Sequence, residues 1–119
     1  KKGLYFMDTP GREMEMLTGL AGGGCQVIVF STGVGAPQGF PIVPVIKVTG
    51  NEHTCTHLAE HIDIDVSGIV RGEETLATAG QRILDTIVAV ASGSRVQAER
   101  LEYDCQGVNL GIYVKGPVI

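Results

Sequence analysis

The stretch VIVFSTGVGAPQGFPIVPVIKV, residues 27–48, decides the fold of this chain. An apolar run from Cys25 to Phe30 leads into a glycine-rich loop, and a second apolar run follows from Val43 to Val48. Apolar runs with so little polar alternation are typical of strands that are covered on both faces. Glycine permits positive φ, and successive free N–H groups in such a loop can bind an anion. The stretch therefore predicts two buried strands joined by a candidate ligand-binding loop.

The flanking sequence predicts strands that alternate with helices. Further strands are expected at Leu4–Met7 and Leu110–Val114, and helices at 12–21, from a cap at Asn51 to about 60, at about 76–91 and at 96–101. The long helix is expected to bury Leu76, Gly80, Ile83, Ile87 and Val90 or Ala91. This alternation favours an α/β fold with a Rossmann-like, mostly parallel sheet flanked by helices. Ligands bind at the carboxyl ends of such strands, which is where the loop at 32–39 begins. A dinucleotide site in the strict sense is not expected, because no third glycine opens a helix.

Composition bounds the class of protein. The chain has 119 residues, is 44% hydrophobic, has a mean hydropathy of +0.20 and carries a net charge of −4. We expect residues 1–119 to form a single α/β domain, the C-terminal fragment of a longer protein, because the sequence begins inside an element and without methionine. The acidic balance argues against nucleic acid and anionic membranes as partners. Three widely spaced cysteines without a CxxC pattern favour a reducing cytoplasm.

The glycine loop supplies the first candidate site. Its candidate substrate-binding residues are Thr32, Gly33, Gly35, Pro37 and Gly39, which combine backbone N–H groups with one hydroxyl. The alternative is a tight crossover in which glycine serves only the shape of the backbone.

Lys47 stands out because it lies inside an apolar strand. An ammonium group there costs desolvation energy unless it reaches water, a carboxylate or an anionic ligand. It could pair with a substrate carboxylate or act as a base with a lowered pKa. The alternative is an edge position with a solvated tip.

Asp63 and Asp65 alternate with apolar residues, so both should point to the same side of an extended segment. Such a pair could hold a divalent cation, or one member could act as acid or base. The alternative is a solvated connection. Glu73 and Glu74 precede the long helix, where negative charge stabilises the helix start.

His53, His57 and His61 are spaced four residues apart, with Cys55 between the first two. Imidazoles at this spacing could converge on a metal ion. Each four-residue step rotates a helix by roughly 40°, however, so three histidines on one short helix close a tetrahedral site poorly. We therefore favour a solvent-facing role for them, and a buried, inert role for the cysteines.

In order along the chain, several blocks resemble the C-terminal part of altronate/galactarate dehydratases. The blocks are Gly3–Asp8, the Thr32-Gly33-x-Gly35-x-Pro37-x-Gly39-x-Pro41 loop, Pro44–Asn51, Ile62–Asp65, Gly72–Thr75 and Gly116-Pro117. Asp65–Gly68 is closer to the sulfolactate sulfo-lyase branch, whereas Val48–Asn51 and Gly72–Thr75 favour the sugar-acid branch.

The resemblance implies a cytoplasmic hydro-lyase that removes water from a sugar acid through an enediolate, with upstream domains and a homo-oligomeric assembly. It implies a divalent metal, Fe²⁺ or Mn²⁺, for which Asp65 and Glu73 are the candidate ligands, and Lys47 and Asp63 as candidate catalytic residues. The fragment alone is expected to be inactive. Two alternatives stay open: a sulfolactate sulfo-lyase large subunit, and a non-catalytic ligand-binding or assembly module.

Overall fold

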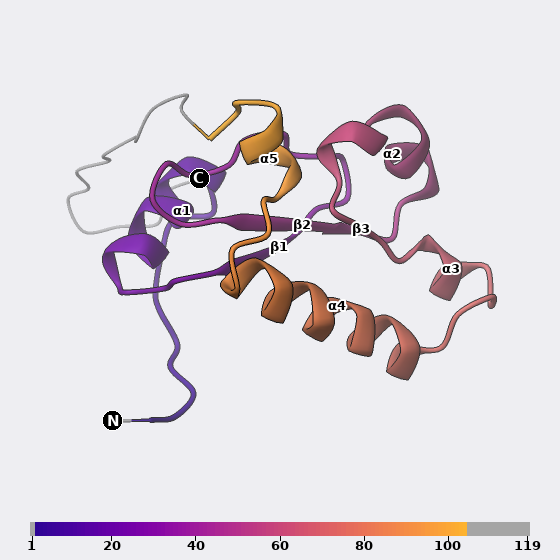
Figure 1. The fold of residues 1–119 in the computed structure, drawn as a ribbon, viewed down its shortest axis with the longest axis horizontal. Coiled ribbons are helices and arrows are strands. Elements are labelled where there is room, and N and C mark those ends of the chain that lie inside the picture. Colours follow the sequence, from indigo (N-terminus) through magenta and orange to yellow (C-terminus); the bar gives the residue numbers. More distant parts are fainter. Residues whose placement is uncertain (1, 105–119) are drawn as a thin grey trace.

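A three-stranded parallel sheet in the order β1-β2-β3 forms the centre of the fold in the computed structural model, which describes residues 2–104 (Figure 1). The strands are β1 (Ile28–Ser31), β2 (Val45–Thr49) and β3 (Ile64–Asp65). Ile28 lies opposite Val45, and Val48 lies opposite Ile64. All five residues of the central strand are buried, as its apolar sequence predicts. The α/β fold with a parallel sheet is thereby confirmed.

Helices cover both faces of this sheet, because successive side chains of β2 point to opposite sides. On one face, Val45 packs with Leu17 of α1 (Glu13–Gly22) and with Phe40 and Val43 of the long loop. On the other face, a second core forms against α4 (Leu76–Ala91) and α5 (Gln97–Arg100). This second core consists of Ile46, Val48, Ile64, Val90, Val96 and Ala98. The result is three layers with β2 at their centre.

Two short helices follow the strands at the end of the sheet where the chain leaves β2 and β3 (Figure 1). They are α2 (Glu52–His57), which is continued by the 3₁₀ helix η1 (Ala59–His61), and α3 (Ser67–Val70). The predicted cap is confirmed, since the Asn51 side chain accepts a hydrogen bond from the His53 N–H. α2 ends at His57, earlier than the predicted end at about residue 60, and α3 was not predicted.

The predicted strand at Leu4–Met7 is wrong. This segment has no regular structure, and the Leu4 and Phe6 side chains are almost fully exposed. Strand propensity reflects packing against neighbouring strands, and no strand of the described chain pairs with this segment. The other predicted terminal strand, Leu110–Val114, lies outside the described residues.

The long helix is confirmed at Leu76–Ala91, but its buried face is rotated from the predicted one. Ala79 and Val90 are buried and Ile83 and Ile87 are partly buried, whereas Leu76 is 77% exposed. The buried face of α4 is the one that packs against the sheet, and it differs from the face that the spacing of apolar residues predicts. None of the helices within residues 2–104 has the length and apolarity needed to cross a bilayer.

Candidate functional site

Three loops meet at the carboxyl edge, by which we mean the edge of the sheet where β1, β2 and β3 end. The Gly33 carbonyl oxygen accepts hydrogen bonds from Asn51 Nδ2 at 2.7 Å and Thr54 Oγ1 at 2.8 Å. These two bonds fasten the loop after β1 to the start of α2. The predicted location of the glycine loop, at the carboxyl end of a strand, is thus confirmed.

Inside this loop, the Gly35 N–H donates to Thr32 Oγ1 at 3.1 Å. Gly35 has φ of +84°, and a Cβ there would overlap with the Leu58 side chain. Glycine is therefore required at this position for backbone shape and for packing. The Gly35 amide is used within the loop, whereas Gly33 and Val34 are exposed at its tip.

The second part of the loop packs against α5. The Gly39 N–H donates to the Tyr103 carbonyl oxygen at 3.2 Å, and a Cβ on Gly39 would lie 2.8 Å from the Ala98 Cβ. Pro37 is partly buried. Substrate binding by Thr32, Gly33, Gly35, Pro37 and Gly39 stays a prediction.

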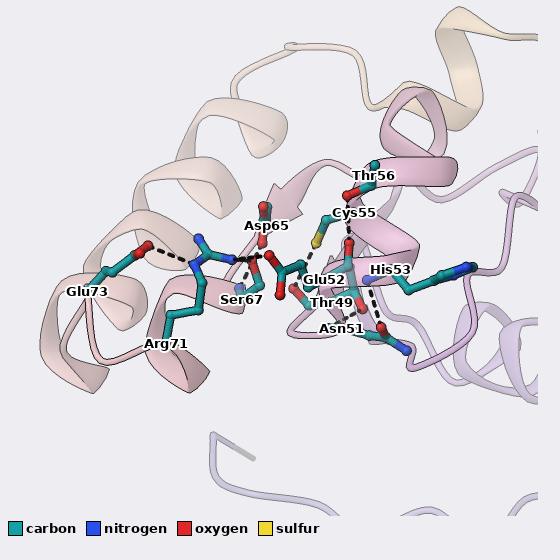
Figure 2. A network of polar contacts seen from close by, with 10 residues as sticks. All are labelled: Thr49, Asn51, Glu52, His53, Cys55, Thr56, Asp65, Ser67, Arg71 and Glu73. Carbon is teal, nitrogen blue, oxygen red and sulfur yellow. Dashed lines mark hydrogen bonds and ion pairs between the residues drawn. The ribbon is translucent and has the colours of Figure 1, made fainter.

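A polar network links the ends of β2 and β3 (Figure 2). Asp65 Oδ1 accepts from the Ser67 N–H at 2.7 Å, and Arg71 Nη1 donates to Ser67 Oγ at 2.8 Å. Arg71 Nε donates to Glu73 Oε2 at 2.8 Å, while Arg71 Nη1 lies 3.7 Å from Glu52 Oε1. Arg71 therefore lies at the centre of this network.

A cleft of about 500 Å³ opens beside this network. Its lining residues are Asp65, Gly68, Arg71, Glu73, Glu74, Thr78 and Arg82. Arg82 Nη1 contacts both carboxylate oxygens of Glu74, and Arg82 Nη2 donates to the Asp65 carbonyl oxygen at 2.7 Å. The structure thus brings the two predicted metal ligands, Asp65 and Glu73, into one cleft together with two arginines.

Hydrogen bonds fix the charges of this network. Bonds from the Cys55 thiol and from Ser67 lower the pKa of Asp65, so its carboxylate is ionised at neutral pH. The hydrogen bond to Glu73 raises the pKa of Arg71. Desolvation and the neighbouring Asp65 raise the pKa of Cys55, which holds it as a neutral thiol. The edge offers fixed charges of both signs but no activated thiolate.

As a metal site, Asp65 and Glu73 do not suffice. Within residues 2–104, no three His, Cys, Asp or Glu side chains lie close enough together to hold a metal ion. Arg71 also donates to Glu73 and, through Ser67, adjoins Asp65. A guanidinium group in this position opposes a second cation by like-charge repulsion. The pair therefore does not fit a metal without ligands from elsewhere.

Lys47 is enclosed in the layer between the sheet and α1. Its side chain is 0% exposed, its Nζ lies 2.5 Å from Glu13 Oε1, and the same atom lies 4.5 Å from the centroid of the Phe30 ring. Burial lowers the pKa of Lys47, opposed by the bond to Glu13. The alternative of a solvated tip on an edge strand is wrong, because β2 is the central strand.

Asp63 joins β2 to α5. Its Oδ2 accepts from the Lys47 N–H at 2.7 Å and its Oδ1 accepts from the Gln97 N–H at 2.8 Å. It also lines a second cleft of about 380 Å³ with Asp85, Arg95 and Arg100. Burial raises the pKa of Asp63, against the effect of its hydrogen bonds. Asp63 and Asp65 therefore belong to separate networks, and the catalytic roles of Lys47 and Asp63 stay predictions.

The three histidines do not converge. His53 and His57 are exposed on α2 with stacked rings, as the solvent-facing prediction expects. His61, on η1, instead packs edge-on against the Tyr103 ring, and its buried Nδ1 has no hydrogen-bond partner among the described residues.

Arg71, Arg82 and Ser67 are the residues at the carboxyl edge that sequence reasoning missed as site residues. The Asp65-x-Ser67 spacing is a signal for the local turn, because an aspartate side chain commonly accepts from the N–H two residues on. The contacts of Arg82 with Glu74 and with the Asp65 carbonyl span 8 and 17 residues, so no local pattern marks them.

A parallel sheet with helices on both faces and with polar loops gathered at its carboxyl edge defines an α/β domain of the kind that binds ligands at that edge in other proteins. The profile of the family described as D-galactarate/altronate dehydratase, C-terminal, matches residues 1–111. The chain therefore belongs to this family, as the sequence resemblance implied.

Three curated relatives illustrate the range of the family. Altronate dehydratase of Escherichia coli is 32% identical over 101 residues, which cover 85% of this chain and 20% of the relative. Galactarate dehydratase (L-threo-forming) of the same organism is 35% identical over 95 residues, which cover 80% of this chain and 18% of the relative. The (2R)-sulfolactate sulfo-lyase subunit beta of Chromohalobacter salexigens is 42% identical over 99 residues, covering 83% and 25%. The chain thus spans about a fifth to a quarter of the length of these relatives.

Proposed function

We propose that this chain is part of a cytoplasmic enzyme that removes water from a sugar acid of the altronate/galactarate type, and that its carboxyl edge forms one wall of the substrate site. One observation carries the proposal: in a chain of this family, the bonds from Asn51 and Thr54 to Gly33 hold the loops after β1 and β2 together at that edge. Carboxyl edges of parallel sheets are where such domains bind small ligands.

Two arginines at the edge suit an acidic substrate, and they share the cleft with the carboxylates of Asp65, Glu73 and Glu74. Arg71 and Arg82 supply planar guanidinium groups, which match a carboxylate geometrically. Arg71 is held by Glu73, whose side chain is 63% exposed, and exposed ion pairs are weak. A substrate carboxylate can therefore replace Glu73 on Arg71 at little energetic cost. In the proposal, Arg71 anchors the substrate through its carboxylate.

The proposed reaction begins with removal of the proton next to that carboxylate, and electron density moves onto the carboxylate as an enediolate. Loss of hydroxide from the neighbouring carbon, with a proton supplied to it, gives an enol that becomes the keto acid. Fixed positive groups at the carboxylate stabilise the enediolate. Lys47 and Asp63 remain the predicted catalytic residues, although both are engaged by partners within the fold.

The divalent metal, Fe²⁺ or Mn²⁺, also remains a prediction. Asp65 and Glu73 do not form a complete donor set with other described residues, so the proposal assigns no reaction step to a metal on this chain. Further ligands would have to come from parts of the enzyme outside residues 2–104.

A second candidate function is cleavage of the C–S bond of sulfolactate. It is favoured by the 42% identity to the sulfo-lyase subunit, which exceeds the 32% and 35% of the two Escherichia coli dehydratases. A carboxylate and a sulfonate are both oxyanions, and the two arginines suit either.

The test is an assay of a full-length enzyme that contains this chain, with altronate, galactarate and sulfolactate as substrates. Keto acid formed from a sugar acid without sulfite supports the dehydratase, and sulfite released from sulfolactate alone supports the second candidate. Arg71→Ala is expected to raise KM about tenfold or more, since charged hydrogen bonds contribute roughly 1.5–3 kcal/mol. Its matched control is Arg12→Ala, an exposed arginine outside both clefts, which should leave KM unchanged. Folded enzyme that turns over none of the three substrates would overturn the proposal.

A further inference from the structure

His53 and His57 form a pair on the exposed side of α2. The two residues are one helical turn apart, their ring centroids are 4.0 Å apart, and their ring planes differ by 17°. Side chains at i and i+4 lie above one another on a helix, so two imidazoles there can chelate one ion. The lone pair of each ring nitrogen lies in the plane of its ring, so both exposed rings must turn out of the stack to meet the same ion. The neighbouring residues Asn51 and Thr54 bind the Gly33 carbonyl, so the pair lies beside the carboxyl edge.

The proton on the His57 ring can be assigned from its hydrogen bond. His57 Nδ1 lies 2.9 Å from the His53 carbonyl oxygen, and a carbonyl oxygen only accepts. Nδ1 therefore carries the hydrogen of the neutral ring, and Nε2 carries a free lone pair. Metal-binding histidines in proteins are commonly held in this way, with the other ring nitrogen donating to a backbone carbonyl. This contact thus favours the His57 tautomer that binds a metal ion through Nε2.

The pair differs from the Asp65 and Glu73 carboxylates in its surroundings. Arg71 donates directly to Glu73, whereas the His53 side chain points away from Arg71 (Figure 2). Neutral imidazole is also a ligand of zinc, copper and nickel, while carboxylates suit harder ions. The histidine pair and the Asp65 and Glu73 carboxylates should therefore prefer different metal ions.

We propose that His53 and His57 bind one divalent first-row transition metal ion in bidentate fashion. Two protein ligands leave the remaining coordination positions open. A 2-hydroxy acid can fill two of these positions through its carboxylate and hydroxyl oxygens. Only this binding of the hydroxy acid rests on the proposed function. The metal pair itself requires only the geometry of α2.

The experiment titrates the protein with Cu²⁺, Ni²⁺, Zn²⁺ and Mg²⁺ by calorimetry, and with paramagnetic Co²⁺ by NMR of the imidazole signals. Affinity should be highest for Cu²⁺ and undetectable for Mg²⁺ in the same concentration range, following ligand softness and the order of divalent ions. Co²⁺ should broaden the His53 and His57 signals, while His61, packed against Tyr103, serves as the internal control.

His53→Gln and His57→Gln are each expected to weaken Zn²⁺ binding at least tenfold, and the double variant should weaken it little further, because either change destroys the chelate. Both side chains are exposed, so circular dichroism should show an unchanged fold. Equal Zn²⁺ affinity in wild type and His53→Gln, Mg²⁺ binding as tight as Zn²⁺, or Co²⁺ broadening of His61 first would each overturn the proposal.

A final arm adds lactate, a simple 2-hydroxy acid, to the Co²⁺-loaded protein and records the visible spectrum. A lactate-dependent change that is absent from the His57→Gln variant supports binding of a hydroxy acid to the metal ion. An unchanged spectrum overturns that binding. The dehydratase assay on the full-length enzyme is independent of these readouts, so failure of the metal pair and failure of the proposed function are told apart.

Discussion

Asp63 and Asp65 lie two residues apart, yet the fold gives them opposite environments. Asp63 is held by the backbone N–H groups of Lys47 and Gln97, and burial raises its pKa. Asp65 is exposed at the carboxyl edge, and hydrogen bonds from Cys55 and Ser67 lower its pKa. One residue of extended chain between them is enough to move a carboxylate from a structural connection to a candidate site.

The two ion pairs repeat the same contrast. Lys47 and Glu13 meet beneath α1, with Lys47 fully enclosed, whereas Arg71 and Glu73 meet in an open cleft. A buried pair cannot lose one partner without leaving an uncompensated charge, while an exposed pair exchanges its partner with water or a ligand at low cost. Interior charges should therefore govern stability, and charges at the carboxyl edge should govern binding.

Asp63→Ala is the substitution with the largest expected effect on this contrast. It leaves the Lys47 and Gln97 N–H groups without acceptors, and each unsatisfied buried donor costs about 1–3 kcal/mol. We expect a loss of about 2–6 kcal/mol in the free energy of unfolding, measured with urea. The matched control, Asp65→Ala, removes one acceptor at the surface and should cost clearly less. Equal losses in the two variants would contradict the division into interior and edge.

Lys47→Met tests the buried ion pair. Methionine retains most of the apolar volume but leaves Glu13 without its partner, and breaking a buried pair costs roughly 3 kcal/mol or more. Because the Glu13 side chain is 23% exposed, we expect a loss of about 3 kcal/mol or less in the free energy of unfolding. The double variant with Glu13→Gln should recover most of it in urea unfolding. Full stability combined with lost turnover in Lys47→Met would instead support the predicted catalytic role.

Gly35→Ala tests the loop that reaches the carboxyl edge. Its φ of +84° costs roughly 1–2 kcal/mol for a residue with a Cβ, and the Leu58 side chain must also shift. Gly33→Ala is the matched control, because its Cβ would meet nothing within 4 Å. Thermal unfolding should show a lower midpoint for Gly35→Ala alone. Equal midpoints would show that the loop adapts.

These contrasts explain which features could be predicted from sequence. The Asn51 cap and the long helix depend on residues within a few positions of one another, so local patterns revealed them. The location of the glycine loop followed from strand order alone. Local signals of this kind are the most informative part of a sequence.

Other features depend on contacts between distant parts of the chain. The enclosure of Lys47 requires Glu13, 34 residues away, and the second hydrogen bond of Asp63 comes from Gln97, again 34 residues away. The apolar segment at Leu4–Met7 carries a strand signal, but the described chain gives it no strand to pair with. Period-two alternation could not predict that Asp63 and Asp65 belong to separate networks, because their partners come from different elements.

The pH dependence of stability should carry the same contrast, with a smaller effect. Between the unfolded pKa of 3.8 and its raised folded pKa, Asp63 binds more protons in the folded state, so its contribution falls as pH rises through that window. For Asp65 the folded pKa is lowered, so its contribution is present above 3.8 and is lost as pH falls through the folded value. The free energy of unfolding, measured with urea from pH 3 to 7, should not show the fall with rising pH in Asp63→Asn. In Asp65→Asn it should not show the loss of stability at acidic pH.

Arg71→Ala should have the smallest effect on stability of all these changes. Its guanidinium is exposed, and its partner Glu73 is hydrated when left alone, so the urea midpoint should match that of the wild type within error. The same variant is expected to weaken binding of an anionic substrate, and Arg71→Lys should restore only part of it, because lysine lacks the planar pair of donors. A shifted urea midpoint in Arg71→Ala would place this residue with Lys47 and Asp63 among the groups that hold the fold, and the carboxyl edge would then lose its anion anchor.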